Sequence, residues 1–404
     1  MYSILKNKNE GLKQNTLAFA EELVRVPSVT LNEAKIAGLV EAKMREIGYD
    51  KVFRDDAGNV VGVMLGREAE PTVLLNSHLD TVASPEGNPP RIENGRLYGT
   101  GAADCKGGLA AQVFTGALLR RSLLPLRGNL VVAATVAEEN GRSTGVRVLM
   151  ERTLPLLGMK PTFAILGEPT GLGLYYGHDG WMEIDVVVEG ANPFHVDDVT
   201  KAIYDDFGAN RQRRGVRPAH EPETLAVRKP RFETVGDFRR ATIPMTRRLG
   251  FGEDAGSVVN QLQHDAEMVY QSGGGVAVEV AVRKETKRMY NGMATTVQHI
   301  THAWAIDPFH PLFSRACQSL AAADCEVRPA KWQLGRLGMG TAGSVLVKEF
   351  NVPAIGYGPG GEAQAHVADE YVETAKITEA VYGTTAMVHG LIGIPVCGWT
   401  SDEI

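Results

Sequence analysis

Cysteines are scarce in this sequence. Only four occur among 404 residues, and their spacing is irregular: Cys105, Cys317, Cys325 and Cys397. A disulfide framework needs more cysteines in a shorter chain, and a zinc knuckle needs closely spaced pairs. Both are therefore excluded, and we expect reduced thiols and a cytoplasmic location.

Long hydrophobic runs are also missing. The sequence has no stretch of about 20 consecutive apolar residues, and residues 1–16 contain no apolar core of a signal peptide. The formal net charge is -6, with 48 acidic against 42 basic side chains. The chain as a whole therefore does not attract nucleic acid or an anionic membrane, and a small molecule is the expected partner.

The pattern of apolar residues predicts an α/β fold. Hydrophobic residues make up 44% of a chain that is longer than one core usually supports, so we expect two domains. Helical and strand-like periodicities alternate, as in a mixed sheet flanked by helices. The predicted helices cover 15–47 (a pair), 107–120, 253–270 and 311–323, and the predicted strands cover 60–65, 72–75, 130–136, 162–166, 182–188, 276–282 and 353–357.

A change of composition near residue 190 indicates an insertion. Residues 211–250 hold eleven Lys or Arg against four Asp or Glu, with several prolines and little helical periodicity. A helix and a strand follow, and the α/β pattern resumes after residue 308. A smaller α+β domain is therefore expected to interrupt the sheet domain, with boundaries at 1–182, 183–300 and 301–404.

Acidic residues and histidines gather near the ends of predicted strands. A surface His–Asp pair or a solvated acidic loop would explain one such segment by itself. Five segments in which Asp, Glu or His follows an apolar run predict a common cleft, because the ends of neighbouring strands meet at one edge of a sheet. The residues concerned are His78 and Asp80, Asp104, Glu138 and Glu139, Glu168, and His366.

Three of these segments suggest particular chemistry. Asp80 can accept a ring N–H of His78, which would fix the tautomer and raise the basicity of a metal ligand. Asp104 lies in a glycine-rich loop before a helix, where it is either an N-cap or a bridge between two cations. The side chains of Glu138 and Glu139 point apart, so one can hold a metal while the other faces a reacting water.

Taken together, the segments resemble the co-catalytic zinc hydrolases. This family includes acetylornithine deacetylase, succinyl-diaminopimelate desuccinylase, aminoacylase and carboxypeptidase G. The resemblance covers about residues 15–190 and 300–390. The motifs that carry it are His-x-Asp, an Asp in a GxGxxD loop, Glu-Glu, a GEPT turn, and a late Ala-His after GxGPG.

The resemblance implies two divalent ions, with zinc favoured over cobalt or manganese. Asp80 would orient His78, and Glu138 would be the general base, since it is the carboxylate left free of metal. N and O ligands without thiolate suit these ions and leave a position for water. The implied ligands are His78 and Glu168 for one ion, Glu139 and His366 for the other, and Asp104 as the bridge.

The resemblance also implies that the inserted domain is a lid that joins two copies into a homodimer. His195 corresponds to a histidine that reaches the neighbouring subunit's active site, with a packing role in the lid as the alternative. Asp237 and Arg239 resemble an Asp-x-Arg strand whose guanidinium binds a substrate carboxylate, with an Asp–Arg pair on the lid sheet as the alternative.

Two segments depart from the family pattern. Residues 338–344 are GMGTAGS where many relatives have Thr/Ser-Asp, and residues 211–250 lack a longer lid helix. Both departures concern substrate preference. Cys105 adjoins Asp104, but we expect it to pack rather than to bind, because no His–Cys pairing is evident nearby in the sequence.

The expected activity is hydrolysis of the amide bond in N-acylated amino acids, by metal-activated water and a glutamate base. An exopeptidase needs the same metals and one carboxylate clamp, so it remains an alternative. Hydrolysis of another C–N bond is a further one. A metal-binding protein without turnover is less favoured, because neither a ligand nor the base is missing.

Overall fold

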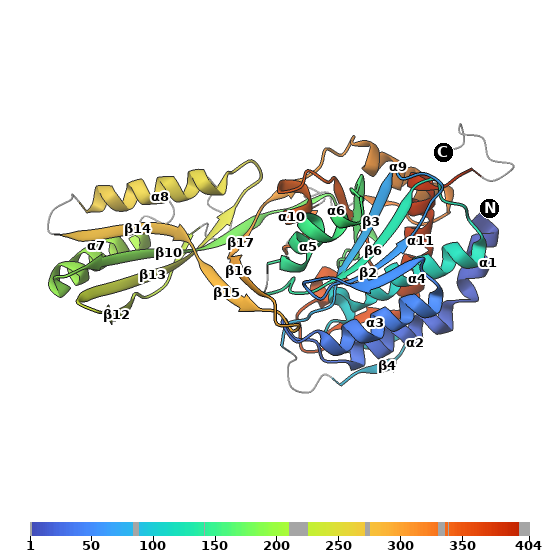
Figure 1. Cartoon of the computed structure of the whole chain (residues 1–404), viewed down its shortest axis with the longest axis horizontal. Coiled ribbons are helices and arrows are strands. Elements are labelled where there is room, and N and C mark those ends of the chain that lie inside the picture. The colour runs from blue at the N-terminus through green and yellow to red at the C-terminus, as the bar shows by residue number, and fades with distance from the viewer. Residues whose placement is uncertain are drawn as a thin grey trace. The chain divides into compact units, whose positions relative to one another are not determined.

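Two units make up the chain in this computed structural model, which describes residues 2–83, 89–140, 142–209, 225–270, 275–329, 336–337 and 339–395 (Figure 1). Unit 1 comprises Met1–His178, Lys287–Thr295 and Trp304–Ile404. Unit 2 comprises Asp179–Thr286 and Thr296–Ala303.

A six-stranded mixed sheet forms the centre of unit 1. In the order β1-β2-β6-β3-β7-β21, the strands from β6 to β21 are parallel neighbours, whereas β1 and β2 pair antiparallel. Strands β2, β3 and β6 are buried along their whole length, which explains their continuous apolar runs. The bounds are β1 Lys51–Arg54, β2 Val60–Met64, β6 Asn129–Thr135, β3 Thr72–His78, β7 Phe163–Leu166 and β21 Ala354–Gly356.

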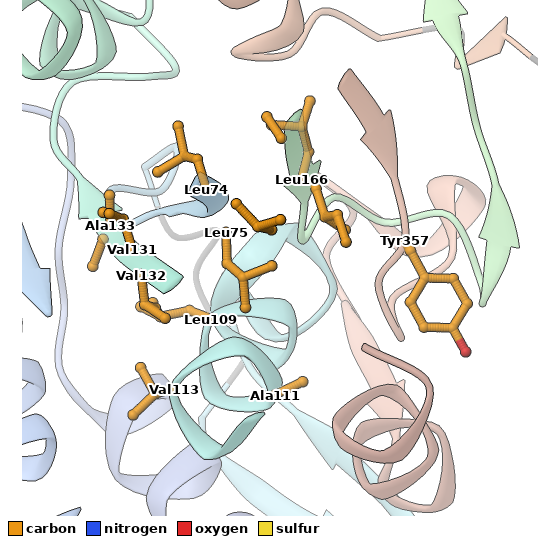
Figure 2. Packing of buried hydrophobic residues seen from close by; sticks show 14 of the residues in the cluster. Leu74, Leu75, Leu109, Ala111, Val113, Val131, Val132, Ala133, Leu166 and Tyr357 are labelled. Carbon is orange, nitrogen blue, oxygen red and sulfur yellow. The ribbon is translucent and has the colours of Figure 1, made fainter. Parts of the chain in front are cut away.

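Helices flank this sheet and share its core. Figure 2 shows Leu74 and Leu75 on opposite sides of β3, with Leu75 on the side of Leu109 from α4. All three side chains are fully buried. The helices of unit 1 are α1 Tyr2–Glu10, α2 Lys13–Arg25, α3 Ala34–Ile47, α4 Gly107–Ser122, α5 Thr144–Val148, α6 Leu154–Leu156, α9 Pro311–Ala322, α10 Gly343–Lys348 and α11 Thr374–Ile392.

Short strands complete unit 1. A three-stranded sheet, β22-β5-β4, lies beside the turn that leads into α4, and a two-stranded ribbon joins β15 and β16. The tip of this ribbon belongs to unit 1, where the Tyr290 hydroxyl donates a 2.8 Å hydrogen bond to the carbonyl of Gly58. The ribbon strands β15 Lys284–Arg288 and β16 Ala294–Gln298 each belong partly to unit 1 and partly to unit 2. The other bounds are β4 Arg91–Glu93, β5 Arg96–Tyr98, β8 Gly173–Leu174, β9 Gly177–His178, β18 Trp304–Ala305, β19 Arg328–Pro329, β20 Arg336–Leu337 and β22 Tyr371–Glu373.

Unit 2 is an antiparallel sheet with two helices. Its strands follow the order β11-β13-β10-β14, and β10 alternates between buried and partly exposed residues. The buried residues of β10 form an apolar core with α7 and α8. The elements are β10 Gly180–Gly190, α7 Pro193–Ala209, β11 Leu225–Val227, β12 Arg231–Val235, β13 Phe238–Leu249, α8 Ala255–Val269, β14 Val276–Val282 and β17 Ile300–Thr301.

The predicted α/β sheet and its smaller α+β insertion are confirmed, but some helices were missed. The α11 helix is buried on nearly all sides, so it lacks the amphipathic stripe by which helices are recognised. The α7 helix was also missed, although its buried apolar residues recur three or four positions apart, as in an amphipathic helix: Val196, Val199, Ile203 and Phe207. Within the basic segment, residues 210–224 lie outside the described part, and the remainder forms β11, β12 and β13.

Candidate active site

The carboxyl ends of three parallel strands position the predicted residues of unit 1. His78 is the last residue of β3, whose neighbours β6 and β7 end at Thr135 and Leu166. Glu138 and Glu139 therefore follow β6, and Glu168 follows β7, at the same edge of the sheet. Parallel strands bring their ends together in this way because they share one direction.

One group of four side chains lies at this edge, inside the protein. The ligand atoms of His78, Asp104, Cys105 and Glu168 all lie within 4.8 Å of one another, and all four residues are buried. His78 Nε2 is 3.2 Å from Asp104 Oδ1, and His78 Nδ1 is 2.8 Å from the backbone carbonyl of Asp80. Since a carbonyl only accepts, Nδ1 carries the hydrogen of that bond and Nε2 faces the group.

A second group shares Asp104. The ligand atoms of Asp104, Glu139 and His366 also lie within 4.8 Å of one another. His366 Nε2 is 3.1 Å from Asp104 Oδ2 and 2.8 Å from Glu139 Oε1. Asp104 thus offers Oδ1 to His78 and Oδ2 to His366, which is the arrangement required of a carboxylate that bridges two ions.

The charges of these groups depend on one another. Burial opposes ionisation of Asp104, but the hydrogen bonds to His366 and His78 hold the pKa of its carboxyl below the ordinary value. The carboxylates of Asp104 and Glu139 accept hydrogen bonds from His366, and this raises the pKa of its imidazole to about 10. Burial raises the pKa of Glu168 well above its ordinary value, and nearby carboxylates add to this shift.

Glu138 belongs to neither group. The Ser143 hydroxyl donates a 3.1 Å hydrogen bond to Glu138 Oε1. Removal from water raises the pKa of Glu138 to about 8, with contributions from Glu139, Asp80 and Asp104, although His78 acts in the opposite direction. A carboxylate with a pKa near neutrality is suited to take up a proton and return it.

Asp80 differs from the sequence prediction. Its carboxylate Oδ1 is 3.7 Å from His78 Nδ1, beyond hydrogen-bond distance, because the backbone carbonyl of Asp80 takes that N–H instead. The carboxylate accepts the backbone N–H groups of Glu138 and Glu139, each at 3.0 Å, and the Thr30 hydroxyl at 2.8 Å. Asp80 therefore positions the Glu138–Glu139 turn directly and His78 through its main chain.

One contributor, Glu370, escaped sequence reasoning. Glu370 accepts the N–H groups of Gly101, Ala103 and Asp104 at 2.9 to 3.0 Å, so this buried carboxyl holds the loop of the shared ligand. Burial raises the pKa of Glu370 to about 7, against the effect of these hydrogen bonds. Cys105 was expected to pack, and its sulfur lies beside the first group, where it accepts the backbone N–H of His78 at 3.2 Å and donates to the carbonyl of the same residue at 3.6 Å. An acid in the segment HVADEYV was the only sequence signal for Glu370.

His195 and Arg239 belong to unit 2. His195 is exposed in the first turn of α7. Arg239 Nε is 3.2 Å from Asp197 Oδ1, and its guanidinium lies 4.7 Å from the centre of the Phe232 ring. The ion-pair partner of Arg239 in the described part of unit 2 is thus Asp197 on α7, whereas Asp237 lies in the turn between β12 and β13.

The donor atoms fit divalent transition metals. Imidazole nitrogen and carboxylate oxygen are the donors that zinc, cobalt and manganese share in proteins, and both groups supply them. Glu168 Oε1 is buried without a hydrogen-bond partner among the described residues, so a bound cation would satisfy it.

An α/β domain with two donor groups that share a carboxylate, beside a further glutamate, has the arrangement of a metal-dependent hydrolase. Residues 74–390 match Peptidase family M20/M25/M40, and the chain belongs to this family. The LysW-lysine hydrolase of Deinococcus radiodurans is 29% identical over 386 residues, which are 93% of this chain and 97% of that relative. The succinyl-diaminopimelate desuccinylase of Gluconacetobacter diazotrophicus is 28% identical over 321 residues, which are 70% of this chain and 81% of that relative.

Solved structures show the same fold. Aminopeptidase PepT from Bacillus cereus superposes with a TM-score of 0.69 at 18% identity, over 94% of this chain and 98% of the other. YXEP from Bacillus subtilis, described as a dinuclear metal binding peptidase, reaches a TM-score of 0.67 at 15% identity, over 94% and 98%. Among the described residues, no helix is both long and apolar enough to span a membrane.

Proposed function

We propose that this protein hydrolyses the amide bond of N-acylated amino acids. The observation that carries the proposal is the shared carboxylate of Asp104, which faces His78 with one oxygen and His366 with the other. Two relatives support an acyl-amino-acid substrate, because their names describe hydrolysis of LysW-lysine and of succinyl-diaminopimelate. The match with this chain covers 97% and 81% of these relatives.

Two divalent ions would be held by the two donor groups. When bound, such ions polarise the scissile carbonyl and lower the pKa of water. We favour zinc, with cobalt or manganese as substitutes, because the donors are imidazole and carboxylate groups. The proposed ligands are His78 and Glu168 for the buried ion, Glu139 and His366 for the other, and Asp104 for both.

Glu138 would move the protons of the reaction. Its carboxylate lies beside both groups, and Asp80 fixes its main chain. We propose that Glu138 takes a proton from the attacking water and delivers it to the nitrogen of the leaving amino acid. Its place outside both donor groups supports this role, because it leaves the carboxylate free to exchange protons.

Unit 2 would serve as a lid and dimerisation domain. Its strand β14 pairs with β10 and with no other strand in the described part of the chain, so it is an edge strand at which a second copy could pair. The Gln263 side chain accepts the N–H of Val280 at 2.7 Å and donates to the carbonyl of Val278 at 3.1 Å, and a pairing strand would displace it. We propose a homodimer through unit 2, in which His195 enters the partner's site. Arg239, already aligned by Asp197 and Phe232, would bind the substrate carboxylate.

The test is a substrate panel combined with metal analysis. Purified protein loaded with zinc, cobalt or manganese is assayed for amine release from N-acetyl, N-succinyl and N-carbamoyl amino acids and from dipeptides. Each N-acyl amino acid is paired with the analogue whose α-carboxylate is an amide, and we expect the analogue to be a poor substrate. Elemental analysis should give two ions per chain. Cleavage of dipeptides alone would favour an exopeptidase, and one ion or none would refute the dinuclear site.

A further inference from the structure

One buried amide holds the base of the segment that carries Glu138 and Glu139. We propose that Asn59 is a positioning residue for both glutamates, and that Tyr290 keeps the turn of Asn59 in place. The inference rests on the proposed function and adds two residues that act on the proposed base and on one proposed ligand through the main chain.

Asn59 joins the two ends of this segment. Its side chain is fully buried, its Oδ1 accepts the backbone N–H of Val136 at 3.0 Å, and its Nδ2 donates to the carbonyl of Gly145 at 2.8 Å. Val136 directly follows β6 and lies two residues before Glu138. A Cβ atom on Gly145 would lie 2.5 Å from Asn59 Oδ1, so only glycine permits this close approach.

Between these ends the chain pairs with itself. Three backbone hydrogen bonds of 3.2 Å connect residues 136–138 with residues 143–145, and the last of them joins Ser143 to Glu138. The Ser143 hydroxyl also donates to the Glu138 carboxylate at 3.1 Å. Because Asn59 bonds the pair at which this series begins, a shift of its amide would be passed along to Glu138.

The orientation of the Asn59 amide is fixed by its partners. Its Nδ2 also donates to Asp55 Oδ2 at 2.7 Å, and neither a carboxylate nor a carbonyl can donate in return. Asp55 Oδ1 accepts the backbone N–H groups of residues 57–59 at 3.0 to 3.1 Å, which closes a tight turn. Both amide hydrogens and the amide oxygen of Asn59 are therefore used, and no other side chain of this length offers all three bonds.

The tip of the β15–β16 ribbon holds this turn. The Tyr290 hydroxyl donates to the carbonyl of Gly58 at 2.8 Å, and Asn291 Nδ2 donates to the carbonyl of Asp56 at 2.7 Å. Gly58 has a φ of 96°, and a Cβ atom on it would lie 2.5 Å from the Tyr290 ring. Glycine at this position thus allows the ring to pack directly on the turn that ends at Asn59.

Loss of the Asn59 amide should affect the two metal positions unequally. Glu139, a proposed ligand of the second ion, belongs to the segment that Asn59 holds, whereas His78 and Glu168, proposed for the buried ion, follow other strands. A displaced segment would therefore weaken one position more than the other. It would also move Glu138, which should lower kcat more than it changes KM.

Chelator competition with Zn²⁺ measures the two binding steps without depending on turnover. In Asn59→Ala we expect one step to weaken about 10–100-fold and the other to remain as in wild type. The matched control is Asn129→Ala at the start of β6. Asn129 is also buried, accepts the N–H of Gly66 at 3.1 Å and donates to the carbonyl of Ala69 at 2.7 Å. Its loss should lower the free energy of unfolding in urea but leave the ratio of the two metal affinities unchanged.

Tyr290→Phe removes one hydroxyl and leaves Asn59 intact, so it decides the question if Asn59→Ala does not fold. We expect a smaller shift of the affinity ratio in the same direction, and none in Tyr382→Phe, whose hydroxyl donates to the carbonyl of Ala323 at 2.9 Å. A shift in Asn59→Ala alone would overturn the part assigned to Tyr290. An unchanged ratio in every folded Asn59 and Tyr290 variant, with two ions bound by the wild type, would overturn the positioning role alone. A wild type that binds fewer than two ions would overturn the proposed function as well.

Discussion

The carboxylate of Asp80 holds the main chain of Glu138, whose N–H it accepts at 3.0 Å. Its other oxygen accepts the N–H of Glu139 at 3.0 Å and the Thr30 hydroxyl at 2.8 Å. One fully buried side chain thus fixes the proposed base and a proposed ligand together. Small movements of this turn would displace both at once.

Asp80→Asn should therefore impair catalysis without unfolding the protein. The amide keeps one acceptor oxygen, but its NH₂ group must face the N–H of either Glu138 or Glu139, which would shift the turn. We expect kcat/KM or metal affinity to fall about 10–100-fold, as for other groups that orient ligands. Thr30→Val, which removes only one donor to the same carboxylate, is the control and should have a smaller effect. An Asp80→Asn enzyme with normal activity and metal content would contradict the argument.

Glu138→Gln tests the base itself. Glutamine preserves the shape of the side chain and can still accept the hydrogen bond from Ser143, but it cannot take up a proton at neutral pH. We expect both ions to stay bound and kcat to fall about 10²–10⁴-fold, measured by steady-state kinetics alongside elemental analysis. Ser143→Ala removes the neighbouring donor alone and should stay much closer to wild type. Near-normal turnover in Glu138→Gln would place the base elsewhere.

Glu33 should make the stability of the protein depend on pH. Burial, and then the charge of Asp80, raise the pKa of Glu33 from 4.5 to about 7, although hydrogen bonds from Leu31 and Ala137 act in the opposite direction. Between these values the folded state keeps a proton that the unfolded chain has released. The free energy of unfolding should therefore fall as pH rises from about 4.5 to about 7, by roughly 3 kcal/mol from this group.

Urea unfolding of the metal-free protein at several pH values measures this effect. Glu33→Gln does not titrate, so its free energy of unfolding should change less over the same pH range, whatever its absolute stability. Glu370, with its pKa also raised to about 7, leaves a residual slope in both proteins. Equal slopes for wild type and Glu33→Gln would show that Glu33 is ionised in the folded state.

A feature could be predicted where a local pattern in the sequence indicates it, and not where it depends on contacts between distant segments. The ends of β3, β6 and β7 meet because parallel strands share a direction, and so apolar runs followed by His78, Glu138 or Glu168 were informative. The contact of Glu370 with residues 101–104 links segments that no periodicity connects. The place of Cys105 depended on the path of one turn, where the backbone brings its sulfur back to His78.

The assignment of His195 has the least local support, because it belongs to unit 2 while Glu138 belongs to unit 1. The edge strand β14, where Gln263 contacts the main chain of Val278 and Val280, motivates a dimer through unit 2, and His195 lies in the exposed first turn of α7. If each site combines Glu138 from one copy with His195 from the other, two inactive variants should complement each other.

Glu138→Gln and His195→Ala are mixed under conditions in which subunits exchange, with exchange followed by native mass spectrometry. In a mixed dimer one site holds an intact Glu138 and receives an intact His195, so activity should recover to at most about half that of a wild-type dimer, since one of its two sites is repaired. The control pair, Glu138→Gln with His366→Ala, places both defects in unit 1 and should recover less. Full exchange without recovery in the first pair would mean that His195 acts within its own chain or only in packing.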